Sequence, residues 1–131
     1  MHKSQAFAAF RTELVADLQN DIETSLLPTF NSEIEDIRRS TQEVAETKGQ
    51  ALADHHRRAR IMDLKIRQQQ FIDELNQEMH EALTKRVKDY GGTIEAVNDG
   101  EKEVLEAKFP DGSNARVPKS LWINYEKFDR V

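Results

Sequence analysis

The side chains in this chain that are best suited to chemistry are its histidines. His55 and His56 follow Asp54 directly, and His80 precedes Glu81. Neighbouring residues on a helix point about 100° apart, and no second pair of ligands stands four residues away, so this spacing does not match a metal site. We interpret these histidines as solvated side chains on a helix or in a turn, and we expect no bound metal.

Other catalytic patterns are missing from the sequence. It has no suitable ordering of Ser, His and Asp, no phosphate-binding glycine loop and no HExxH motif. The absence of cysteine removes disulfides, thiolate zinc sites and thiol nucleophiles together. Paired acids such as Glu35 with Asp36 belong to a generally acidic surface. We therefore expect a protein without enzymatic activity and without a cofactor.

A basic segment at residues 55–67 is the main candidate for contact with nucleic acid. A helix that binds nucleic acid usually belongs to a basic domain, because neutralised phosphates supply most of the affinity. This chain instead has 24 acidic and 19 basic residues and a net charge of −5. A salt-bridged face within the chain or between subunits is the preferred interpretation, and binding of DNA or RNA is the alternative. The side chains concerned are Arg57, Arg58, Arg60, Lys65 and Arg67, with His56 beside them.

The composition indicates which elements position these residues. Of the 131 residues, 37% are hydrophobic and 33% are charged, which suits long helices with one narrow apolar stripe each. The N-terminus lacks the apolar core of a signal peptide, and no apolar run approaches the roughly 20 residues that span a bilayer. We expect a soluble protein without membrane contact that is not secreted, located in the cytoplasm or within a viral or phage particle.

The chain divides near Gly91 and Gly92, because glycine and proline are rare before this pair and frequent after it. Residues 1–90 are predicted to form a helical assembly region, and residues 91–131 a small antiparallel β module. The fold class predicted is therefore α+β.

Proline and capping signals set the predicted helix boundaries. Pro28 cannot stand inside a regular helix without losing a hydrogen bond and clashing with the preceding turn, so a break is expected there. Ser32 and Glu35 have the spacing of a capping box, which predicts a new helix start near residue 31. The predicted helices cover about residues 4–26, 31–48 and 54–90.

Apolar residues recur at steps of three and four along all three helices, which is the spacing of a coiled-coil seam. Thr41 and Lys48 are polar occupants of this seam and weaken it as an autonomous zipper. We expect the seam to join copies of the protein or other subunits. The residues predicted to form this oligomerisation seam are Phe7, Phe10, Leu14, Leu18, Ile34, Ile37, Val44, Ile61, Leu64, Phe71, Leu75 and Met79.

The apolar seam changes phase between residues 51 and 61. This change admits a stammer in one continuous rod or a turn that joins two antiparallel helices. Charge favours the turn, because residues 21–48 are acidic whereas residues 57–67 are basic. A reversal near Gly49 would bring Glu43 and Glu46 beside Arg57, Arg58 and Arg60, and Glu35 and Asp36 beside Lys65 and Arg67. We prefer this helical hairpin, with the rod as the alternative.

Two Asp-Gly pairs, at residues 99–100 and 111–112, separate alternating segments in the β module. Such pairs are typical of hairpin turns and predict a three-stranded antiparallel meander. Leu105, Ala107 and Phe109 share one face of the middle strand, and this apolar face needs a cover. The cover would come from the end of the preceding helix or from the tail, whose apolar residues are Leu121, Trp122, Tyr125 and Phe128.

Within the β module, residues 92–97 (Gly-Thr-Ile-Glu-Ala-Val), 106–112 (Glu-Ala-Lys-Phe-Pro-Asp-Gly) and 117–121 (Val-Pro-Lys-Ser-Leu) form a further pattern. This pattern resembles the small SH3-like barrels of the Tudor and KOW type. The resemblance covers residues 92–121 and implies a binding platform for proteins or nucleic acids. The aromatic cage of that family is not evident, because Trp122, Tyr125 and Phe128 follow the pattern. These three residues are the candidate surface of the module.

Taken together, these features predict a non-enzymatic assembly or adaptor protein. Its helical seams would join copies of itself, other protein subunits or both, and its β module would present a second binding surface. A subunit of a larger phage or viral particle fits this description. The alternative is a nucleic-acid-associated regulator that binds through residues 55–67 or through the β module.

Overall fold

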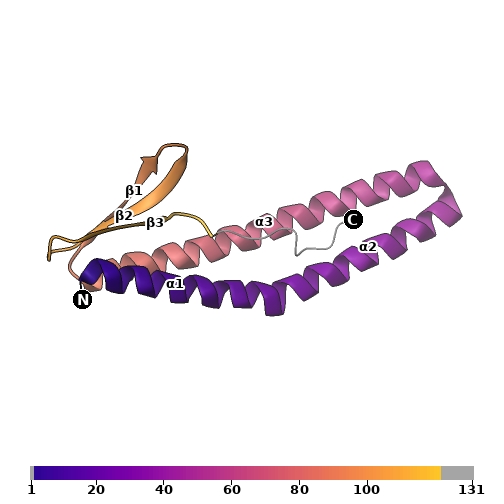
Figure 1. The fold of residues 1–131 in the computed structure, drawn as a ribbon. Helices are drawn as coiled ribbons and strands as arrows, with labels where there is room; N and C mark the ends of the chain where they lie inside the picture. Colours follow the sequence, from indigo (N-terminus) through magenta and orange to yellow (C-terminus); the bar gives the residue numbers. More distant parts are fainter. Residues whose placement is uncertain (1, 122–131) are drawn as a thin grey trace. The chain divides into compact units, whose positions relative to one another are not determined.

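The structure is a computed structural model and describes residues 2–121; the candidate surface residues Trp122, Tyr125 and Phe128 lie outside this part. It confirms the α+β class, with helices followed by a three-stranded antiparallel sheet (Figure 1). The elements in chain order are α1 (Lys3–Asp21), the π-helix η1 (Ile22–Leu26), α2 (Leu27–Lys48), α3 (Gln50–Asp89), β1 (Thr93–Asp99), β2 (Lys102–Lys108) and β3 (Asn114–Pro118).

The described chain forms two compact units that do not follow the predicted boundary at residues 91–92. One unit consists of residues 20–72, and the other combines residues 2–19 with residues 73–121. The sheet therefore shares its unit with the first helix and with the last turns of α3.

In the unit of residues 20–72, α2 and α3 form the predicted antiparallel hairpin. Gly49 alone separates the two helices, with φ 96° and ψ 165°, a left-handed φ that favours glycine (Figure 1). The Phe30 and Phe71 rings meet edge to face with centroids 5.9 Å apart, and Ser40 Oγ lies 2.9 Å from His56 Nε2. These contacts confirm the hairpin and exclude the continuous rod for this unit.

The predicted break at Pro28 is wrong, because α2 begins at Leu27 and continues directly from the π-helix. Leu27 N–H donates to the carbonyl of Ile22, five residues back, which is the π pattern. In a regular helix the proline ring would meet the carbonyl of Thr24, and the wide turn that includes Thr24 accommodates the ring. Ser32 therefore lies inside α2 and does not cap a helix.

Charge connects the two helices through Glu33 and Arg67, whereas Glu35 and Asp36 were predicted to lie beside Arg67. Arg67 donates two hydrogen bonds to the carboxylate of Glu33, at 2.7 and 2.5 Å. This bidentate hydrogen bonding lowers the pKa of Glu33 and raises that of Arg67. Glu35 and Asp36 instead pair within α2. The predicted register is therefore wrong at this position, because both acids point away from α3 whereas Glu33 lies toward it.

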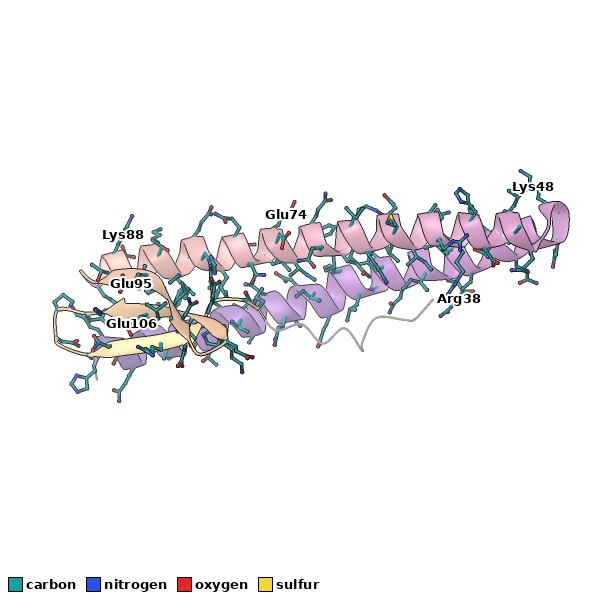
Figure 2. All side chains as sticks on the ribbon, turned by 90° about the horizontal axis from the view of Figure 1, so that it is seen from above. Arg38, Lys48, Glu74, Lys88, Glu95 and Glu106 are labelled. Atoms are coloured by element: carbon teal, nitrogen blue, oxygen red, sulfur yellow. The ribbon has the colours of Figure 1, made fainter. Side chains whose placement is uncertain are left out.

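The sheet in the other unit confirms the meander, with strand order β1-β2-β3 and both pairs antiparallel. Glu106 lies opposite Glu95 on β1 and opposite Arg116 on β3 (Figure 2). Arg116 Nε donates to Glu106 Oε2 at 2.7 Å, and this hydrogen bond lowers the pKa of Glu106. Arg116 therefore offsets the repulsion between the two facing carboxylates.

Phe7 of α1 and Tyr90, which directly follows α3, pack against Phe109 on the apolar face of the sheet. The Phe109 ring contacts the Phe7 ring on α1, with centroids 5.7 Å apart, and the Tyr90 ring at 6.0 Å. Leu121 is also buried, and its N–H donates to Asn76 Oδ1 on α3 at 2.7 Å. α1 thus contributes to the cover, which the sequence did not predict; of the predicted tail residues, Leu121 is buried, and the other three lie outside the described part.

The loop between β2 and β3 caps the start of α1. Asp111 Oδ2 accepts from the backbone N–H of Lys3 at 2.8 Å, and Ser113 Oγ accepts from that of Ser4 at 3.2 Å. These are donors that a helix start leaves without partners inside the helix. The Ser113 hydroxyl, together with the N–H groups of Lys3 and Ser113, lowers the pKa of Asp111 to about 2.

This capping contact gives a pH-dependent prediction. Because the pKa of Asp111 is below the value of about 3.9 in an unfolded chain, its ionised form stabilises the fold above pH 4. That contribution is lost as the pH falls from about 4 to about 2. We expect Asp111→Asn to lower the melting temperature at pH 7, measured by circular dichroism, and to have a shrinking effect toward pH 2. Asp17→Asn, at an exposed position on α1, is the control. A difference that stays constant between pH 7 and pH 2 would contradict this account.

Candidate interaction surface

The predicted oligomerisation seam is packed largely within the single chain. Phe71 is the exception, at 46% exposed. Five other members are half-buried: Phe10, Leu14, Val44, Ile61 and Leu75. Six members are buried: Phe7, Leu18, Ile34, Ile37, Leu64 and Met79. The six buried side chains are thus part of the core of the single chain.

On α3, three large apolar side chains are exposed on one face of the helix. Leu52 is 53% exposed, Met62 66% and Ile66 53%. At 100° per residue, Met62 points away from the buried Ala53 and Leu64, which face α2. The exposed residues His55 and Ala59 complete the spacing of three and four. We name these five residues, Leu52, His55, Ala59, Met62 and Ile66, the outer row.

The charges beside the outer row differ on its two sides. Arg58 and Lys65 are exposed along one side, and among the residues that the structure describes neither forms an ion pair. Asp63 is exposed on the other side and lies 3.1 Å from Arg67. The outer row is thus an apolar stripe with a basic and an acidic border.

The structure separates the five basic residues that were candidates for nucleic-acid contact. Arg67 is held between Glu33 and Asp63, and Arg60 is close enough to Glu33 to lower its pKa further. Arg57 lines a cleft at the hairpin tip. Arg58 and Lys65 lie on the outer face of α3. The basic segment therefore presents no single continuous basic face.

Two of the histidines on α3, His56 and His80, contact other parts of the chain within their own units. His56 contacts Ser40 across the hairpin, as described above. In the other unit, His80 Nε2 lies 2.5 Å from the carbonyl oxygen of Lys119, which ties α3 to the residue after β3. Within residues 2–121, no group of three or more His, Asp or Glu side chains has an arrangement that could hold a metal ion.

Open clefts lie within both units of the described chain. One, of about 350 Å³, lies near the tip of the hairpin, where the hydroxyl of Thr41 is buried and has no hydrogen-bond partner among the described residues. It is lined by Arg38, Thr41, Gln42, Ala45, Gln50 and Arg57. A second, of about 430 Å³, is lined by Gln77, His80, Glu81, Thr84, Lys85 and Lys88.

Comparisons with protein-family models, with curated proteins and with solved structures find no match to this chain. Among the described helices, none has a stretch both long and apolar enough to cross a membrane. The function is therefore inferred from the residues of the chain itself.

Sequence reasoning missed the outer row, although its spacing is visible in the sequence. Residues 52–66 contain two overlapping apolar stripes, one through Ile61 and Leu64 and one through Met62 and Ile66. Both stripes have helical periodicity, and only the position of α2 decides which one is buried. A check for a second stripe on the same helix would have revealed the outer row.

Proposed function

We propose that this protein is a non-enzymatic assembly protein whose copies associate through the outer row of α3. The observation that carries the proposal is the exposure of Leu52, Met62 and Ile66 on one helix face at coiled-coil spacing. Exposed apolar residues are common singly, but an aligned stripe between charged borders is typical of an interaction surface. The sheet would present a second surface, for other protein subunits. Such a subunit would serve in a cytoplasmic complex or within a phage or viral particle.

Nucleic-acid binding is less well supported than self-association. Of the basic residues, Arg67 is paired with Glu33, and the charge of Arg60 acts on the same carboxylate and lowers its pKa. The two that remain exposed beside the outer row, Arg58 and Lys65, flank an apolar stripe, whereas phosphate binding needs no such stripe.

Substitution of Met62 tests the proposal. Because Met62 is 66% exposed, Met62→Lys should leave the protomer folded while it places a third cation beside Arg58 and Lys65. We expect the dissociation constant of the self-associated form to rise at least tenfold, measured by light scattering after size exclusion. Far-ultraviolet circular dichroism should show unchanged helix content.

Glu43→Lys provides the matched control, because Glu43 is exposed on α2 and remote in the helical wheel from the face toward α3. It should leave self-association unchanged. Equal weakening by both variants would contradict the proposal. Retention of the wild-type monomer on heparin, lost on Arg58→Ser, would favour nucleic-acid binding instead.

A further inference from the structure

We infer that two copies of this chain pair in parallel along the outer row, with Arg58 of each copy facing Asp63 of the other. This inference rests on the proposed function and specifies its partner, a second copy, and its orientation. It follows from the spacing of the outer row and from the charges on its two borders.

The outer row has the order of a heptad repeat. Leu52, Ala59 and Ile66 take the first core position, named a, and His55 and Met62 take the second, named d. The stripe begins in the first turn of α3, which starts at Gln50. It covers about two heptads, so we expect a weak dimer at the low end of interface size.

The border charges discriminate between the two orientations. In this heptad Arg58 takes position g and Asp63 takes position e of the next repeat. In a parallel pair, position g of one copy faces position e of the other copy, five residues further along. Arg58 of one copy therefore faces Asp63 of the other, and the two-fold symmetry forms this pair twice in each dimer. In an antiparallel pair, g borders lie together, and Arg58 would meet Lys65 of the second copy. Attraction in one arrangement and repulsion in the other favour the parallel dimer.

The heptad pattern of the outer row also limits the length of the contact between the two copies. The next core positions after Ile66 are Gln69 and Asp73, which are both exposed. In a parallel pair, Asp73 of one copy would face Asp73 of the other copy. Like charges opposite one another in a seam are unfavourable. We therefore place the end of the contact before Asp73.

Single cysteines test the orientation, because the chain contains none of its own. In a parallel pair residue 66 faces residue 66, so Ile66→Cys should form a disulfide-linked dimer under mild oxidation. In an antiparallel pair residue 66 lies near residue 55, and two copies of residue 66 are about 16 Å apart along the helix. Ala59→Cys, near the middle of the outer row, should crosslink in both orientations. Glu43→Cys gives the background rate of random collision.

The expected result is crosslinking of Ile66→Cys as fast as that of Ala59→Cys and at least tenfold above Glu43→Cys. In an antiparallel pair, Ala59→Cys crosslinks, Ile66→Cys alone does not, and a mixture of His55→Cys with Ile66→Cys does. That result overturns the inference but leaves the proposed self-association standing. If neither row variant exceeds Glu43→Cys, both the inference and the proposed function fail.

Charge reversal supplies an independent readout. Arg58→Glu and Asp63→Lys should each raise the dissociation constant of the dimer about tenfold, because each places like charges opposite one another. An equimolar mixture of the two variants should recover wild-type affinity as a heterodimer, detected by native mass spectrometry. No recovery on mixing would overturn the Arg58 to Asp63 pairing.

Discussion

Replacement of Phe7 by alanine should lower the free energy of unfolding by about 3–5 kcal/mol. Phe7 is fully buried, and its ring packs against Phe109 of the segment that follows β2. Removal of the ring leaves a cavity where α1 covers the sheet, and a small three-stranded sheet is marginal without such a cover. The loss is a large part of the roughly 5–15 kcal/mol typical of a whole domain.

Urea denaturation followed by circular dichroism measures this change. Phe71→Ala is the matched control, because that ring is 46% exposed and contacts the Phe30 ring on the other helix of the hairpin. It should cost much less than Phe7→Ala. A loss below about 1 kcal/mol for Phe7→Ala would show that α1 does not stabilise the sheet in the way described.

Gly92→Ala is the second substitution with a large expected effect. A β-carbon at residue 92 would lie 2.5 Å from the carbonyl oxygen of Lys108 and 3.0 Å from Cδ1 of Phe109. The Lys108 backbone belongs to the pairing of β2 with Thr93, so the oxygen cannot retreat without disturbing the sheet. Gly92 N–H also donates to the carbonyl of Val87, closing the end of α3 in a Schellman motif. We expect a loss of about 3 kcal/mol in the free energy of unfolding.

Gly100→Ala is the informative comparison. Gly100 has a φ of 68°, which disfavours alanine, but a β-carbon there meets nothing within 4 Å. The conformational cost alone is about 1 kcal/mol. Gly92→Ala should therefore be the more damaging of the two, although Gly92 does not have a positive φ. The reverse order, in thermal or urea unfolding, would contradict the close packing of residue 92.

Local signals in the sequence predicted the turns correctly. Gly49, Asp99-Gly100 and Asp111-Gly112 all stand where the chain reverses, because these residues tolerate backbone conformations that others avoid. Gly91 likewise takes the left-handed conformation after α3, with φ 75°. Turn chemistry acts over a few residues, so a local pattern suffices to predict it.

Other features depend on distant parts of the chain and could not be predicted in the same way. The π-helix that accommodates Pro28 leaves no pattern that distinguishes it from a break. The capping of α1 by Asp111 joins residues 108 positions apart in sequence. The division of apolar stripes between core and surface requires knowledge of which helix lies beside α3, and this is why the outer row was assigned no role from the sequence.

Sedimentation equilibrium of the full chain over a range of concentrations tests the central claim most directly. The protomer has a mass of 15.1 kDa. If the outer row joins two copies, the mean mass should rise toward twice this value with concentration, and Met62→Lys should hold it near the protomer mass. A wild-type mass that stays at 15.1 kDa up to about 1 mM, equivalent to about −4 kcal/mol of binding, would contradict the account.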